Sequence, residues 1–71
     1  RVTIAENAAE EVAEGAPVYA PGVLDVDEGV DRETDLLACY TPDGAVVCLG
    51  RLVGDPDAER GEVVRLERVL I

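Results

Sequence analysis

Histidine, lysine, methionine, phenylalanine and tryptophan are absent from this chain of 71 residues, which carries two tyrosines and two cysteines. Two cysteines without a histidine do not form any of the common ligand sets for zinc. The lack of histidine also removes the most frequent general base, and no serine or cysteine nucleophile with suitable partners is evident. We therefore expect no metal site, no cofactor and no catalytic residue in this chain.

Long apolar runs are absent as well, so the sequence predicts no membrane-spanning segment and no secretory signal. A chain of 71 residues forms one domain at most, and a domain of this size buries only about 60% of its extended surface. The first residue is Arg1 rather than methionine. This is what we expect of a C-terminal domain taken from a larger cytoplasmic protein.

Negative charge dominates the composition, because sixteen carboxylates outnumber six arginines and give a formal net charge of −10. Since 48% of the residues are hydrophobic, the composition is that of a folded domain rather than of a disordered acidic tail. An acidic surface without lysine indicates a halophilic archaeon, since molar salt shortens the Debye length to about 3 Å and weakens repulsion between carboxylates. An ordinary acidic mesophilic domain is the alternative.

Short apolar strands and turn residues alternate along the chain, which predicts a mainly β domain with one short N-terminal helix. Asn7 and Glu10 have the spacing of a capping box for this helix, and Gly15 stands where helices end in a left-handed residue. Near the C-terminus the apolar positions do not alternate cleanly, which predicts a bulge near Glu67 and Arg68. We expect strands over residues 2–4, 17–20, 23–26, 36–41, 45–52 and 63–71.

The clearest hairpin surrounds a turn at residues 42–44. With a three-residue loop, Thr41 pairs with Ala45. Cys39 and Cys48 then project from opposite faces and cannot form a disulfide, and we expect buried free thiols in a reducing compartment. A four-residue loop would instead place the two cysteines opposite each other.

Both faces of this hairpin are apolar. In the register with the three-residue loop, one face carries Leu37, Cys39, Val47 and Leu49, and the other carries Leu36, Ala38, Tyr40, Val46 and Cys48. A single exposed sheet does not have two apolar faces, whereas a small barrel with a covered outer surface does.

A stiff segment follows the helix, since residues 15–23 hold a short apolar strand between two Gly/Pro pairs. Proline fixes φ, and glycine permits positive φ and close approach of a ligand or a neighbouring backbone. From these residues alone, a helix end followed by a strand between prolines explains the pattern best, and a ligand-binding segment is the alternative. Tyr19 can lie in the core or at its rim, and strand alternation favours burial.

In this order, these features resemble the PUA domain, a small RNA-binding pseudo-barrel of about five to six strands, and above all the C-terminal PUA domain of archaeal dyskerin-family RNA-guided pseudouridine synthases. The resemblance lies in Asn7-Ala8-Ala9, in Gly15-Ala16-Pro17-Val18-Tyr19-Ala20-Pro21-Gly22-Val23, and in residues 35–44, 46–51 and 61–70. The chain departs from the family pattern at Glu14, at Pro17 and at Thr34-Asp35, where the family has His, a polar residue and Gly-Asp, and in a one-residue insertion near Glu33.

The resemblance implies an RNA-binding domain that docks the lower stem and 3′ ACA end of an H/ACA-type guide RNA. A linked catalytic domain would then isomerise a uridine in rRNA or tRNA. The implied partners are RNA, the catalytic domain of the parent protein and other ribonucleoprotein subunits, with no membrane. The implied RNA-binding residues are Gly15, Ala16, Pro17, Val18, Tyr19, Ala20, Pro21, Gly22, Arg51, Arg65 and Arg68.

Four alternatives stay open at this point. The three arginines can pair with carboxylates such as Glu62 and Glu67 instead of RNA. The domain can belong to an archaeosine tRNA transglycosylase and grip the acceptor end of tRNA, or it can be a barrel that docks on protein without RNA. The carboxylates around Asp25 and Asp55 have oxygens that suit divalent cations, but a solvated halophilic surface explains them better.

The first prediction concerns salt. The domain loses part of its folded structure when it is moved from molar KCl to dilute buffer, because repulsion between its surplus carboxylates is then no longer screened. Circular dichroism measured across this range checks the prediction. An unchanged spectrum would remove the main support for a halophilic origin.

Overall fold

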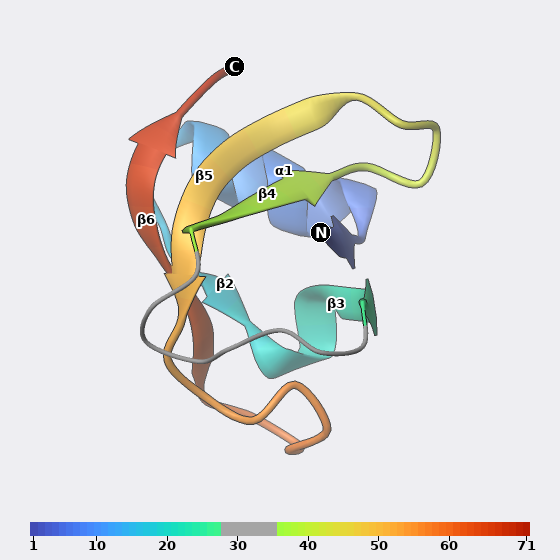
Figure 1. The fold of residues 1–71 in the computed structure, drawn as a ribbon, viewed down its shortest axis with the longest axis vertical. Helices are drawn as coiled ribbons and strands as arrows, with labels where there is room; N and C mark the ends of the chain where they lie inside the picture. The colour runs from blue at the N-terminus through green and yellow to red at the C-terminus, as the bar shows by residue number, and fades with distance from the viewer. Residues whose placement is uncertain (28–35) are drawn as a thin grey trace.

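The computed structural model describes residues 1–27 and 36–71, and Figure 1 shows strands that curl around a common interior beside one helix. The elements are β1 (Val2–Ile4), α1 (Glu6–Ala13), β2 (Val18–Tyr19), the 3-10 turn η1 (Ala20–Gly22), β3 (Val23–Val26), β4 (Leu36–Tyr40), β5 (Val46–Leu52) and β6 (Glu62–Val69). In the described residues the six strands form one sheet in the order β2-β6-β5-β4-β1-β3. β1 and β4 are parallel, and the other neighbouring strands are antiparallel.

Each antiparallel pair in the described part of the chain contains a shift of register. The residue pairs on either side of the shifts leave one unpaired residue each, namely Leu24, Val47, Val63 and Glu67. A bulge bends its strand and increases the local twist. The bends bring β2 and β3, the first and last strands in this order, close together. The short turn η1 links these two strands. The expected mainly β pseudo-barrel with one short helix is confirmed.

The bulge predicted near Glu67 and Arg68 is one of these four. Leu49 pairs with Arg68 and Gly50 pairs with Leu66, so Glu67 is the extra residue of β6. An inserted residue reverses the inward and outward alternation beyond it. This explains why the apolar positions of the last strand do not follow a period of two.

The predicted register of the two cysteines is wrong. Thr41 donates its backbone N–H to the carbonyl of Ala45 at 2.9 Å, as the three-residue loop requires. The bulge at Val47 then shifts β5 by one residue, and Cys39 lies directly opposite Cys48. Both thiols are fully buried and free.

The same bulge overturns the predicted division of the hairpin into faces. Cys48 lies in the core with Leu37 and Cys39, whereas Leu49 is half-buried. The outer side of the hairpin is also less covered than expected, because 52% of Leu36 and 37% of Val46 are exposed.

The N-cap of the helix lies two residues before the predicted cap at Asn7. Its N-cap is Ala5, whose side chain makes no capping hydrogen bond, and Asn7 lies within the first turn. The side-chain Oδ1 of Asn7 accepts a hydrogen bond from the backbone N–H of Ala8 at 3.0 Å. The N–H of Ala5 is held by the carbonyl of Gly22 at 2.8 Å, so the tertiary structure rather than Asn7 sets where the helix starts.

The helix ends as predicted at Gly15, which has φ +97°. The N–H of Gly15 donates to the carbonyl of Val12 at 2.9 Å, and the N–H of Ala16 donates to the carbonyl of Glu11 at 3.0 Å. These two bonds form a Schellman motif, which satisfies carbonyls that the helix leaves without partners. The chain changes direction at this motif and continues as the stiff segment that leads to β2.

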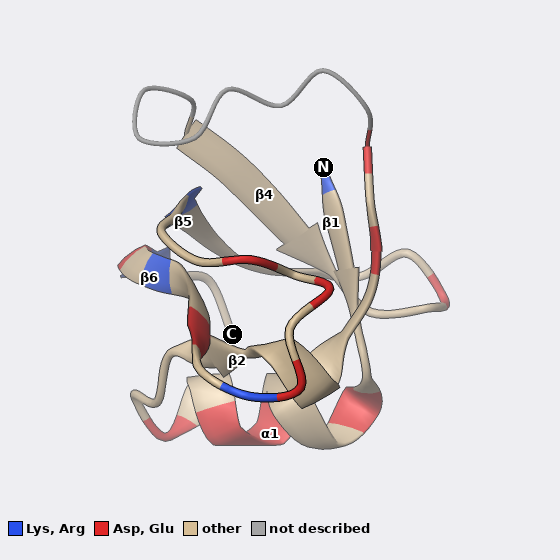
Figure 2. Ribbon diagram, turned by 90° about the horizontal axis from the view of Figure 1, so that it is seen from below, with Lys and Arg blue, Asp and Glu red and all other residues tan. Residues whose placement is uncertain are grey.

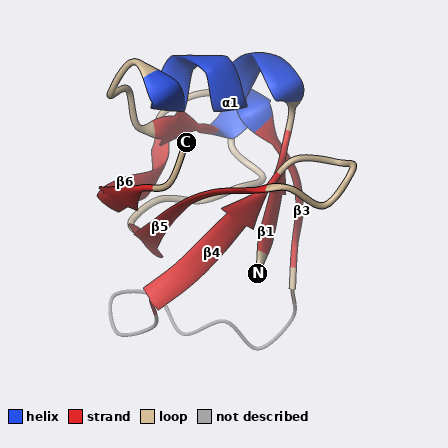
Figure 3. Ribbon diagram, turned by 90° about the horizontal axis from the view of Figure 1, so that it is seen from above, coloured by secondary structure: helices blue, strands red, loops and turns tan. Residues whose placement is uncertain are grey.

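Small aliphatic side chains fill the space between the sheet and the helix. The buried residues include Val2, Ile4, Val18, Val47 and Val64, and no polar or charged residue of the described ranges is buried. Figure 3 shows α1 lying across one end of the curled sheet. The helix closes this end with its apolar side, which carries Ala8, Ala9 and Val12.

Several predicted boundaries differ from those observed. The strand expected over 17–20 is reduced to two residues because η1 begins at Ala20, and the last strand ends at Val69. The predicted departures at Glu33 and at Thr34-Asp35 lie outside the described residues. In residues 1–27 and 36–71, none of the helices has the length and apolarity that crossing a membrane requires.

A second prediction follows from the helix end. Replacing Gly15 by alanine lowers the free energy of unfolding by about 1–2 kcal/mol, because a Cβ is strained at positive φ. A Cβ at this position meets no other atom within 4 Å, so crowding does not contribute. Gly15→Asn is the matched variant and loses less, since asparagine tolerates this conformation. Denaturant unfolding in molar KCl measures both, and an equal loss in the two variants would contradict the assigned cause.

Candidate nucleic-acid interface

A groove of about 240 Å³ lies between α1 and the segment that runs from β2 into η1. The helix supplies one wall and the segment supplies the other. Its lining residues are Asn7, Ala8, Glu11, Tyr19, Pro21 and Gly22. The stiff segment that was singled out in the sequence therefore borders a concave surface, and only part of it does so.

The predicted segment divides into three groups. Tyr19, Pro21 and Gly22 line the groove. Val18 and Ala20 lie in the core, with 1% and 4% of their surfaces exposed. The remaining residues, Gly15, Ala16 and Pro17, form the helix end and its exit and do not line the groove. The structure thus brings three of the eight predicted residues of this segment together at one surface.

The expectation that Tyr19 lies in the core is wrong, because 45% of its surface is exposed. Alternation holds in this short strand, but Val18 and Ala20 are the residues that point inward. A half-exposed tyrosine at the rim of a groove offers a ring face on which a nucleobase can stack.

Gly22 lies against the helix, and this contact with α1 is not predicted from the sequence. A Cβ built on Gly22 would lie 2.7 Å from the Cβ of Ala8. The space next to Gly22 is therefore taken by the helix, and the residue permits close packing of η1 against α1. A bulky substitution at Gly22 consequently tests the fold as well as any ligand.

Asn7 and Glu11 are groove residues that the sequence reasoning missed. They are four positions apart on α1, and this spacing places both on one side of the helix. The amide oxygen of Asn7 accepts a bond from Ala8, and its amide nitrogen is a donor that a ligand can use. The i, i+4 spacing is visible in the sequence, but the sequence predicts a cap at Asn7 and does not single out Glu11.

The predicted arginines lie on the neighbouring strands β5 and β6. Arg51 is directly opposite Arg65. The Nε of Arg51 is 3.0 Å from Oε1 of Glu67, and the Nε of Arg65 is 3.2 Å from Oε2 of Glu62. Since Glu62 is also the register partner of Tyr19, the Arg65 ion pair lies one strand away from the groove.

Two of the three arginines, Arg51 and Arg65, thus pair with carboxylates, which is one of the alternatives that the sequence leaves open. Arg68 is exposed and lies opposite Leu49, and no ion pair involving it is found within the described ranges. Exposed ion pairs of this kind contribute only about 0.2–1 kcal/mol. A phosphate can therefore replace a carboxylate partner at small cost.

Charge is unevenly distributed around the groove. Figure 2 shows acidic residues along α1 and basic residues on β5 and β6. The exposed acidic residues of the helix include Glu6, Glu10 and Glu11. A ligand in the groove thus meets a negative wall on the helix, and Arg51, Arg65 and Arg68 lie beyond Tyr19 on β5 and β6.

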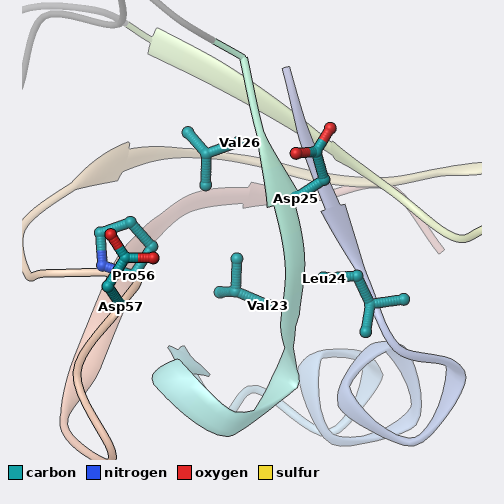
Figure 4. A pocket seen from close by; sticks show the side chains of 6 residues that line it. All are labelled: Val23, Leu24, Asp25, Val26, Pro56 and Asp57. Carbon is teal, nitrogen blue, oxygen red and sulfur yellow. The ribbon is translucent and has the colours of Figure 1, made fainter.

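A second hollow, of about 330 Å³, is lined by Val23, Leu24, Asp25, Val26, Pro56 and Asp57. In Figure 4, Val23 and Val26 point toward Pro56, while Asp25 and Leu24 point to the other side of β3. The two carboxylates therefore do not converge. Within the described part of the chain, no group of three or more carboxylate or thiol side chains is placed to hold a metal ion.

A family model described as the PUA domain matches residues 1–70. The chain belongs to the PUA domain family. Two curated proteins named probable tRNA pseudouridine synthase B resemble it over its whole length. The one from Halobacterium salinarum is 63% identical over 73 residues, and the one from Haloarcula marismortui is 55% identical over 76 residues. This PUA domain spans 24% of the length of each.

Solved structures also contain this PUA domain fold. A structure of an H/ACA ribonucleoprotein bound to a substrate RNA that contains 2′-deoxyuridine includes a chain with a TM-score of 0.89 and 28% identity. The match covers 99% of this chain and 23% of that one. NSun6 from Pyrococcus horikoshii matches with a TM-score of 0.83 and 36% identity, over 93% of this chain and 18% of that one. The resemblance drawn from the sequence is confirmed at the level of the PUA domain.

The third prediction concerns the contact between Gly22 and Ala8. Gly22→Ala lowers the free energy of unfolding by about 1–3 kcal/mol, because the new methyl group overpacks the interface of η1 with α1. Ala8→Gly in the same chain removes the opposing methyl group and recovers part of the loss, although glycine in a helix costs about 1 kcal/mol by itself. Thermal unfolding of both single variants and the double variant measures the coupling. Strictly additive effects would show that the two residues do not contact each other.

Proposed function

We propose that this PUA domain binds RNA and docks an H/ACA-type guide RNA, through its lower stem and ACA end, for a linked pseudouridine synthase domain that acts on rRNA or tRNA. The observation that carries the proposal is the groove with Tyr19 at its rim. Tyr19 supplies a stacking surface, Asn7 and Glu11 supply a donor and acceptors, and the strands beside the groove supply arginines.

The relatives support this assignment. The named relatives are probable tRNA pseudouridine synthases, and one structural neighbour is part of an H/ACA ribonucleoprotein with bound RNA. Because the chain matches only 24% of the relatives' length, we assign the catalytic step to another part of a longer cytoplasmic protein. The other partners of the domain are then that catalytic part and further subunits of the ribonucleoprotein.

Recognition at high salt has to rest on stacking, hydrogen bonds and shape. Counterion release contributes little there, and the domain carries a net charge of −10. Tyr19, Asn7, Pro21 and Gly22 are neutral residues of the groove and lie beside the charged Glu11. These neutral residues are suited to RNA recognition under conditions that weaken contacts to phosphate.

A barrel that docks on protein remains the rival function, and one observation favours it. Large apolar side chains, among them Leu24, Leu36 and Ile71, are 57%, 52% and 60% exposed. Leu36 lies on β4, across β5 and β6 from β2 in the strand order. The rival therefore predicts that a partner contacts residues different from those that line the groove.

The fourth prediction separates the two functions. In an NMR titration in molar KCl, a guide-RNA hairpin that ends in ACA shifts the resonances of the residues lining the groove and of β6. The same hairpin with a scrambled end has a weaker effect. Tyr19→Ala weakens binding about 10- to 100-fold, since a base–aromatic contact contributes about 1–3 kcal/mol.

Leu24→Ala is the matched control, because Leu24 is another exposed large side chain but lies on β3 and does not line the groove. It leaves the affinity for RNA unchanged. Absence of shifts with either RNA would favour the docking barrel, and shifts confined to the apolar residues around Leu36 would contradict the groove as the RNA-binding site. Equal shifts with both hairpins would retain RNA binding and remove the specificity for ACA.

A further inference from the structure

Two cysteines lie side by side in the middle of the sheet and take no part in the groove. Cys39 on β4 is directly opposite Cys48 on β5. Both are fully buried, and both are free. Their outer neighbours in the sheet are Val2 on β1 and Val69 on β6, so the pair has apolar residues on both sides.

The register brings the two Cα atoms within the range that a disulfide needs. Directly opposite residues of an antiparallel pair have Cα atoms about 4.5 or 5.5 Å apart. Disulfides span Cα separations of about 4.4–6.8 Å. Bond formation across β4 and β5 therefore requires no change of register and only a small approach of the two sulfur atoms.

The two thiols also differ in acidity. The thiol of Cys39 donates a hydrogen bond to the sulfur of Cys48. This bond, together with burial, raises the pKa of Cys39. The same bond stabilises a thiolate on Cys48 and lowers its pKa, although burial acts in the opposite direction. Cys48 is thus the sulfur that gives up its proton first and becomes the nucleophile.

We propose that Cys39 and Cys48 form a site of reversible oxidation, at which a small peroxide converts the two buried thiols into a disulfide across the hairpin. The Cys48 thiolate attacks one peroxide oxygen, the O–O bond breaks, and a sulfenic acid forms with release of one water after protonation. The Cys39 sulfur then attacks the Cys48 sulfur, the S–O bond breaks, and a second water leaves. The two cysteines lose two electrons and two protons in all, and one hydrogen peroxide is reduced to two waters.

The surroundings favour the disulfide over further oxidation. A sulfinate or sulfonate carries a charge, and the described core holds no polar or charged residue that would stabilise it. A disulfide is neutral and removes two thiol hydrogens from the apolar interior. Hydrogen peroxide is a small molecule, so local opening of β4 from β5 is enough to admit it.

The bond would join β4 to β5 at the residue pair directly next to the bulge at Val47. It closes the loop from Cys39 to Cys48, and a loop of this length restricts the unfolded chain. We expect the folding equilibrium constant to rise by up to about a hundredfold on oxidation. Because these residues do not line the groove, the proposal stands or falls independently of RNA binding.

The test is treatment of the folded domain in molar KCl with hydrogen peroxide, followed by intact mass measurement and alkylation of free thiols. We expect a mass lower by two hydrogen atoms, loss of both titratable thiols, and a monomer on a non-reducing gel. Dithiothreitol restores the original mass, and the oxidised form unfolds at higher denaturant concentration.

Cys39→Ala and Cys48→Ala are the matched variants, and neither gives the loss of two hydrogen atoms. Circular dichroism confirms that each is folded, and the result on the unaltered domain does not depend on them. The proposal is overturned if both thiols still react with the alkylating reagent after treatment with a peroxide concentration that fully oxidises free glutathione. Gain of oxygen atoms without a crosslink, or a covalent dimer, would overturn it equally.

Discussion

Closure of a short, strongly curved sheet is the constraint on which the rest of this structure depends. The described strands have two to eight residues, which is too few to curl gradually, and each antiparallel pair bends at one inserted residue instead. The bends make a small interior that valine, alanine and cysteine fill. They also bring the two edge strands close enough for η1 to join them, and the groove lies against η1.

The groove and the fold share the contact between Gly22 and Ala8. The helix packs so closely on η1 that a single added methyl group would overlap with it. The N–H of Ala5 bonds to the carbonyl of Gly22 at the same junction, which fixes the start of the helix. Asn7 and Glu11 are therefore held at a set distance from Tyr19 by core packing and not by contacts of their own. A site positioned in this way is preorganised before any ligand arrives, which lowers the entropic cost of binding.

Sequence reasoning recovered the elements of this fold because they depend on local signals. Gly15 ends the helix, the loop before Ala45 has three residues, and a bulge lies at Glu67, as predicted. The predicted register of the cysteines is wrong because the bulge at Val47 has no local signature: valine is typical of regular strands. The predicted cap at Asn7 is wrong because a tertiary hydrogen bond at Ala5 determines where the helix begins.

The candidate site was predicted less completely, because concavity depends on elements that are distant in the sequence. The segment around Tyr19 is recognisable from its resemblance to a family, yet five of its eight predicted residues serve the core or the helix end. The helix wall was missed, since no pattern shows which side of a short helix borders a groove.

The acidic helix and the paired arginines follow from one physical situation. In molar salt, repulsion between carboxylates is weak because it is screened. Glu11 can therefore border the groove, and Glu62 and Glu67 can form ion pairs with Arg65 and Arg51. Each of these exposed pairs is weak. The arginines are therefore held in defined positions on β5 and β6 without being strongly bound to their partners. Under such conditions the neutral groups at the groove decide what binds, and the charged groups around it adjust to whichever anion is present.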